Sequence, residues 1–117
     1  MASTRQILNN LMQADGIVKA VLVGSDGFVI ESTGESQIDE EAVGALVTMA
    51  FSNHDNMGKE LNIGRAKQIM IEFERSVVMA VAIGEDAILA VVTGANANLG
   101  SMRFQVKRFS REIEASI

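Results

Sequence analysis

Residues 87–104 read Ala-Ile-Leu-Ala-Val-Val-Thr-Gly-Ala-Asn-Ala-Asn-Leu-Gly-Ser-Met-Arg-Phe, and this stretch decides the fold. Its almost wholly apolar first part predicts a buried strand that ends at Thr93–Gly94. A short polar loop follows, and a helix is expected from Asn98 to about Ala115. Such a junction either cradles an anion at the helix N-terminus or forms a structural corner.

The loop residues favour the corner and leave the anion site as the alternative. The backbone amides of Asn98, Leu99 and Gly100 could hold an anion. Asn98 is also a preferred N-cap residue, however, and its side chain would itself accept hydrogen bonds from those amides. Gly100 is then expected where the helix packs closely on the sheet.

The composition predicts one folded domain over residues 1–117. Hydrophobic residues make up 48% of the chain, which excludes a disordered polypeptide. The apolar runs stay well short of the ~20 residues that cross a bilayer, so we expect no membrane insertion. There is no cysteine and no signal-peptide pattern, which favours a cytoplasmic location. The net charge of −5 argues against a nucleic-acid partner.

Charge is unevenly distributed along the chain. No Lys or Arg occurs from Ala20 to Gly58, a range that contains seven acidic residues. The last predicted helix instead carries Arg103, Lys107, Arg108 and Arg111 against Glu112 and Glu114. These charges are either solvated faces or surfaces for docking complementary partners.

Working outward, the chain predicts four more strands. Val77–Ile83 is apolar throughout and is joined to the strand of residues 87–93 by a short turn, so the two are expected to pair antiparallel. Residues 65–74 alternate, with Ile69, Ile71 and Phe73 on one face of a half-exposed strand. Upstream, Ile17–Gly24 and Phe28–Ser32 form a predicted hairpin around residues 25–27.

Two more helices are predicted. A short amphipathic helix is expected over Thr4–Ala14, closing near Asp15–Gly16. The second begins after the N-cap Asp39 and runs to about Leu61. We expect its core-facing stripe to contain Val43, Leu46, Val47, Ala50, His54, Met57 and Leu61. A neighbouring seam of mostly small residues would allow a second helix to come close, which suggests self-association.

The order helix, hairpin, helix, three-strand meander, helix predicts an α/β (α+β) fold. The economical arrangement is a five-stranded antiparallel sheet with helices on both faces, because several strands are apolar on both sides.

No arrangement of residues predicts catalysis, and we expect no cofactor and no metal site. His54 is the single histidine, and its place on the apolar stripe favours a satisfied core or interface residue over a ligand. Gly58–Lys59 resembles the end of a phosphate-binding loop, but Glu60 replaces the required Ser or Thr. The acidic residues at 39–41 are explained by the helix dipole. The sequence therefore predicts a protein that is not an enzyme.

In their order and spacing these segments resemble the Roadblock family, of the dynein light chain Roadblock and MglB type. The resemblance runs from about Ile7 to Glu112. It rests on residues 16–23 leading into 25–32, on the capped helix after Asp39, and on residues 87–92 followed by 97–103.

The resemblance implies a sheet in the order 2-1-5-4-3, with the second helix on one face and the terminal helices on the other. It also implies a homodimer in which third strands pair edge to edge and second helices pack together. The predicted interface residues are Ala42, Ala45, Met49, Ser52 and Asn56 on the helix, with Gln68, Met70 and Glu72 on the strand.

The resemblance further implies a Ras-like small GTPase of the MglA type as the partner. The chain would then be a homodimeric regulator or effector, either a GTPase-activating or an exchange partner. Family regulators are thought to reposition the GTPase's own residues without an arginine finger, and Arg75 is expected to be solvated in its turn. The alternative is a passive dimeric scaffold that docks complexes without changing the GTPase rate.

Overall fold

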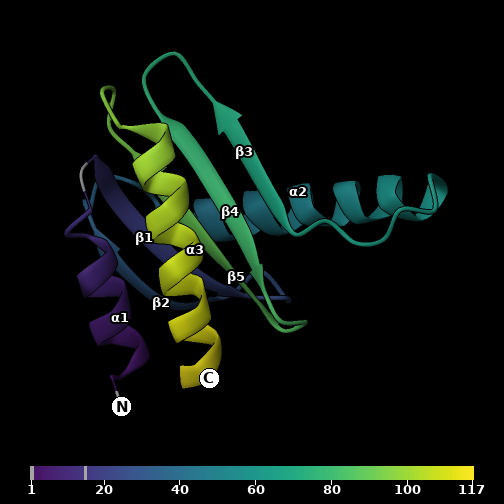
Figure 1. Cartoon of the computed structure of the whole chain (residues 1–117), viewed down its shortest axis with the longest axis horizontal. Coiled ribbons are helices and arrows are strands. Elements are labelled where there is room, and N and C mark those ends of the chain that lie inside the picture. The colour runs from purple at the N-terminus through teal and green to yellow at the C-terminus, as the bar shows by residue number, and fades with distance from the viewer. Residues whose placement is uncertain (1, 15) are drawn as a thin grey trace.

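The computed structural model describes residues 2–14 and 16–117. Three helices and five strands follow one another along the chain (Figure 1). In chain order they are α1 (Thr4–Leu11), β1 (Ile17–Gly24), β2 (Val29–Gly34), α2 (Glu40–Glu60), β3 (Gln68–Glu72), β4 (Val77–Ile83), β5 (Ala87–Thr93) and α3 (Leu99–Ser116).

The first helix is shorter than the predicted Thr4–Ala14. It starts with a capping box, in which Ser3 and Gln6 each accept a hydrogen bond from the other's backbone amide, and it ends at Leu11. Of the predicted closing pair, Asp15 lies outside the described residues. Gly16 has a φ of 87°, a left-handed conformation that glycine adopts at little cost.

The five strands form one antiparallel sheet in the predicted order β2-β1-β5-β4-β3. Val21 of β1 pairs with Ala90 of β5, and Met79 of β4 pairs with Val91 of β5. All seven residues of β5 are buried, as expected for a strand covered on both faces. β2 and β3 form the two edges of the sheet.

Helices cover both faces of this sheet (Figure 1). On one face α1 and α3 pack side by side. One face of α3 packs on the sheet there, with Met102, Val106, Phe109 and Ile113 all buried. On the other face α2 crosses the strands behind the sheet and covers a smaller core around Phe51 and Ile88.

The predicted core stripe of α2 is wrong in most of its members. The buried residues of this helix are Gly44, Val47, Phe51 and Gly58. Leu46, Met57 and Leu61 are instead exposed by 64%, 53% and 61%. The helix carries apolar residues on two faces, and periodicity alone cannot tell which of them meets the sheet. Gly44 identifies the correct face, because an added Cβ there would lie 2.9 Å from the carbonyl oxygen of Gly27.

Candidate interaction surface

α2 extends well beyond the edge of the sheet (Figure 1). Its 21 residues end in a Schellman motif, in which the amides of Asn62 and Ile63 donate to the carbonyls of Lys59 and Gly58. The chain then returns along the helix towards β3. At Gly58 a Cβ would overlap the carbonyl oxygen of Gly64, so the return loop lies directly against the helix backbone.

Asp55 fixes the other end of this return loop. Its Oδ1 accepts a hydrogen bond from the amide of Ala66 at 2.8 Å. Its Oδ2 lies 3.5 Å from a guanidinium nitrogen of Arg65. The projecting part of α2 and residues 61–67 therefore form one hairpin-like unit that leads directly into the edge strand β3.

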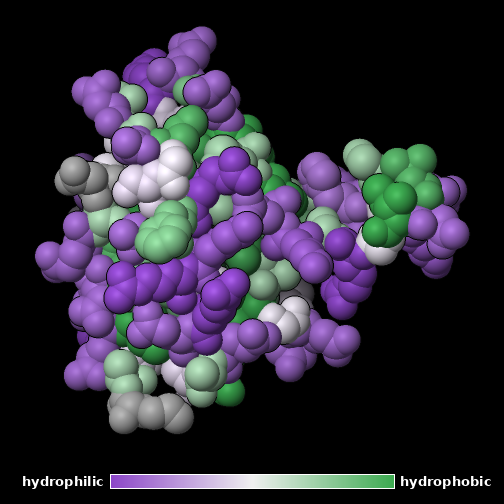
Figure 2. All heavy atoms as spheres, viewed as in Figure 1, coloured by the Kyte–Doolittle hydropathy of each residue, from purple (hydrophilic) through white to green (hydrophobic). Residues whose placement is uncertain are grey.

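Large apolar side chains are exposed along α2, along its return loop and at the end of β3. In the described part of the chain eleven such residues are exposed, and seven of them lie here. We define these seven as the α2–β3 surface: Leu46, Met49, Met57, Leu61, Ile63, Ile71 and Phe73. Figure 2 shows the apolar group at the tip of the projecting unit, surrounded by hydrophilic residues. Several large apolar side chains exposed on neighbouring elements are typical of an interaction site.

β3 also presents an unpaired backbone edge. Phe73 donates to the carbonyl of Ser76, and Ala82 donates to that of Lys67. Hydrogen-bonded positions alternate along an antiparallel pair. Main-chain groups therefore point away from β4 at the three positions Gln68, Met70 and Glu72.

The structure places the predicted interface residues as follows. The five residues on α2 are all exposed. Met49 has the largest apolar side chain among them, and it is 61% exposed. On β3, Gln68 and Met70 are half-buried and Glu72 is exposed. The side chain of Met70 packs against the core under α3, on the opposite face of the sheet from α2. Ile69 packs against the core under α2, so by alternation the α2 face of β3 also carries Ile71 and Phe73.

The β5–α3 junction has the geometry of a capped corner. Asn98 is the N-cap, and its Oδ1 accepts a hydrogen bond from the amide of Ser101 at 3.0 Å. The expected close packing at Gly100 is wrong, because this residue is exposed and an added Cβ would meet only the Asn98 side chain, at 3.5 Å. An anion at Leu99 and Gly100 stays an untested prediction.

The predicted core position of His54 is also wrong, and an interface role for this residue stays a prediction. This residue is exposed, and its Nδ1 lies 2.7 Å from the carbonyl oxygen of Ala50 in the same helix.

Gly58–Lys59 lies inside α2. Asp39 caps α2 by accepting from the amides of Glu41 and Ala42. Arg75 is exposed in the β3–β4 turn.

Residues 2–14 and 16–117 contain neither a candidate metal site nor a candidate membrane span. No group of three or more His, Asp or Glu side chains in that range could hold a metal ion. Within the same range, no helix is both long enough and apolar enough to span a bilayer.

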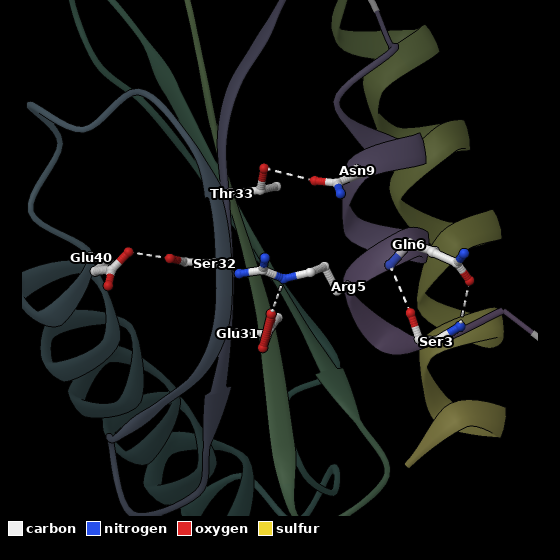
Figure 3. A network of polar contacts seen from close by, with 8 residues as sticks. All are labelled: Ser3, Arg5, Gln6, Asn9, Glu31, Ser32, Thr33 and Glu40. Atoms are coloured by element: carbon white, nitrogen blue, oxygen red, sulfur yellow. Dashed lines mark hydrogen bonds and ion pairs between the residues drawn. The ribbon is translucent and has the colours of Figure 1, made fainter.

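A buried lysine was not expected from the sequence. Lys19 of β1 is only 4% exposed, and its ammonium lies 3.6 Å from Oε2 of Glu40. Glu40 also accepts a hydrogen bond from the hydroxyl of Ser32 in β2 (Figure 3). One carboxylate at the start of α2 therefore contacts two strands. The helix dipole, which explains acidic residues at positions 39–41, does not predict these contacts of Glu40 with Lys19 and Ser32.

The opposite side of β2 is bound to α1 (Figure 3). Nε of Arg5 lies 2.7 Å from Glu31, and this contact raises the pKa of Arg5 through the hydrogen bond and the charge of the carboxylate. The Thr33 hydroxyl donates to Asn9 at 2.9 Å. The edge strand β2 is therefore tied to helices on both faces.

Comparison with known proteins agrees with this architecture. The Roadblock/LC7 domain model matches residues 4–93, up to the end of β5. Protein MJ1340 of Methanocaldococcus jannaschii is 37% identical over 110 residues, covering 94% of this chain and 96% of that relative.

Two solved structures share the fold, including α3. The gliding protein MglB of Thermus thermophilus superposes with a TM-score of 0.89 at 21% identity, over 97% of this chain and 87% of that one. A Roadblock/LC7 domain from Streptomyces avermitilis gives a TM-score of 0.88 at 19% identity, over 97% of both chains. At these identities the likeness concerns the fold.

Proposed function

The chain belongs to the Roadblock/LC7 domain family, and from this premise we propose that it is a non-enzymatic, homodimeric regulator of a Ras-like small GTPase. Residues 1–117 would act as one domain of this family in the cytoplasm. Resemblance to MglB-type members implies the class of partner. The α2–β3 surface is the observation that carries the proposal.

A second copy of the chain is the first expected occupant of this surface. An exposed strand edge next to exposed apolar residues is a liability for a free protomer. Antiparallel pairing of two β3 strands about Met70 would use all three outward positions, since 68 would face 72 and 70 would face 70 of the partner copy. The same pairing would bring the two α2 helices together, where Ala42 and Ala45 permit a close approach.

The GTPase would bind the assembled dimer along the paired α2 helices and the adjoining strand edges. The chain would act by holding the GTPase's own catalytic residues in place, as the resemblance to MglB-type regulators implies. Arg75 is exposed in its turn and has no assigned role in this mechanism.

The test is a measurement of GTP hydrolysis and nucleotide release by the Ras-like GTPase encoded in the same genome, with and without this protein. We expect a change in one of the two rates. Leu46→Ser should reduce the effect, and Phe104→Ser is the matched control, because these side chains are exposed by 64% and 65% on different elements. Neither binding nor a rate change would overturn the proposal. Binding without a rate change would identify the chain as a passive scaffold.

A further inference from the structure

Phe28, Ile30 and Phe104 are large exposed residues that the α2–β3 surface does not include. Phe28 and Ile30 are exposed by 76% and 51% at the β2 edge, and Phe104 is 65% exposed on α3. Acidic residues predominate around Phe28 and Ile30, whereas basic residues predominate around Phe104. The pair therefore has the chemistry of two complementary surfaces.

The first surface is a groove between β2 and the N-terminal half of α2, with a volume of about 850 Å³. Its apolar walls include Phe28, Ile30 and Ala45. Four carboxylates line it: Asp26, Glu31, Glu40 and Glu41. Among the described lining residues Arg5 is the single cation, and it is already paired with Glu31. We call this the β2 groove.

The second surface is the outward face of α3. Lys107, Arg108 and Arg111 follow Phe104 at three, four and seven residues, so all four side chains lie on one face of the helix. All four are exposed, because the opposite face of α3 packs on the sheet. Figure 2 shows that hydrophilic residues dominate the view over α3. We call this the α3 basic face.

We infer that the α3 basic face of one copy docks in the β2 groove of another copy. Phe104 would contact Phe28 and Ile30, and the three cations would face Asp26 and Glu41. A second copy is the favoured occupant because the same chain carries both an acidic groove with apolar walls and a basic helix with one aromatic anchor.

The two surfaces lie on opposite sides of the sheet. Glu40, Glu41 and Ala45 of α2 line the β2 groove, so the groove lies on the α2 face, whereas α3 covers the other face. The contact is therefore heterologous, and it links copies head to tail instead of closing a pair. It goes beyond the proposed function, since it would join copies into larger assemblies. Of the residues proposed for the dimer interface, Ala45 and Met49 also line the β2 groove.

The test is sedimentation velocity over a wide protein concentration range at low and high salt. We expect the wild-type chain to form oligomers larger than a dimer at low salt and only the dimer at high salt, because salt screens exposed charges. We call this formation of larger oligomers growth. Phe104→Ser and Arg108→Glu should each weaken this growth at least about tenfold, since like charges or a lost anchor oppose docking. Both residues are exposed, and circular dichroism melting will establish that the variants fold.

A charge swap sharpens the test. Glu41→Lys alone should also block growth, whereas Glu74→Lys, which makes the same charge change in the β3–β4 turn, should not. Mixing the Arg108→Glu and Glu41→Lys proteins should restore association. The inference would be overturned if the larger oligomers formed equally in these variants, or if the wild type formed none at low salt. Binding of phosphatidylserine vesicles that needs Arg108 while the chain does not grow would also overturn it, because the basic face would then serve a membrane.

Failure of this contact can be separated from failure of the dimer. Leu46 does not line the β2 groove, so Leu46→Glu should weaken the α2–β3 dimer at least about tenfold and leave the salt-sensitive association of single protomers. Loss of both in this variant would count against the inference alone.

Discussion

The ammonium group of Lys19 lies 3.6 Å from Oε2 of Glu40, which joins the buried strand β1 to the first turn of α2. Lys19 is almost fully buried, whereas 43% of the Glu40 side chain is exposed. The carboxylate therefore reaches inward from solvent to neutralise a charge that the fold has enclosed.

Removing the carboxylate is expected to cost more than removing the lysine. Glu40→Ala leaves a buried ammonium unpaired and should lower the free energy of unfolding by roughly 1–2 kcal/mol. Lys19→Met replaces the charge with an apolar chain of similar length and should cost less. The chain has no Trp or Tyr, so urea unfolding is best followed by far-UV circular dichroism. A larger loss for Lys19→Met would contradict this account.

Two glycine-to-alanine substitutions in helices should change stability in opposite directions. Gly58→Ala forces the return loop away, because its Cβ overlaps the Gly64 carbonyl, and should destabilise by roughly 1–3 kcal/mol. Gly100→Ala adds a methyl group at an exposed position and should stabilise by about 0.5–1 kcal/mol through helix propensity. Urea midpoints measure both. Equal effects in the two variants would mean that the loop does not press on α2.

The dimer can be tested by substitutions that differ in their effect on the protomer. Met49→Glu and Leu46→Glu place a charge on the exposed part of α2 and should weaken dimerisation at least about tenfold with little change in protomer stability. Met70→Glu should weaken dimerisation and also destabilise the protomer, because Met70 packs against the core under α3. Analytical ultracentrifugation with parallel melting curves separates the two effects. An unchanged dimer in all three variants would refute the placement of the interface.

The corner at the start of α3 can be separated from an anion site at one residue. Asn98→Ala should cost about 1 kcal/mol through loss of the N-cap. Asn98→Asp keeps the cap and should be close to wild type. If an anion binds the amides of residues 98–100, phosphate should raise the melting temperature of the wild type, and Asn98→Asp should lose this shift through charge repulsion. No phosphate effect in either protein would leave the corner as the sole role.

The sheet order was predictable because local patterns and a family resemblance pointed to the same topology. β4 and β5 are continuous apolar runs joined by a short turn, so their antiparallel pairing followed from the sequence. The cap residues Asp39 and Asn98 were also identified, since each stands just before a helix and has the required side chain.

The faces of α2 were not predictable in the same way. Leu46 and Val47 are neighbours in an apolar helix, and only the crossing of that helix over the sheet buries Val47 and exposes Leu46. A surface that awaits a partner has the same composition as a surface that meets the core. The sequence shows an apolar stripe and a neighbouring seam of mostly small residues, and neither contains the buried residues Gly44 and Phe51. Lys19 gave no signal either, because its partner lies 21 positions away along the chain.

The projecting end of α2 should be able to unfold locally while the rest of the domain stays folded. Phe51 is the last large buried side chain of this helix, and beyond it the helix rests on its own return loop. In a free protomer the amide hydrogens of residues 53–63 should therefore exchange with solvent well before those of the sheet. A partner that covers this segment must also order it, so part of its intrinsic affinity is consumed in completing the fold.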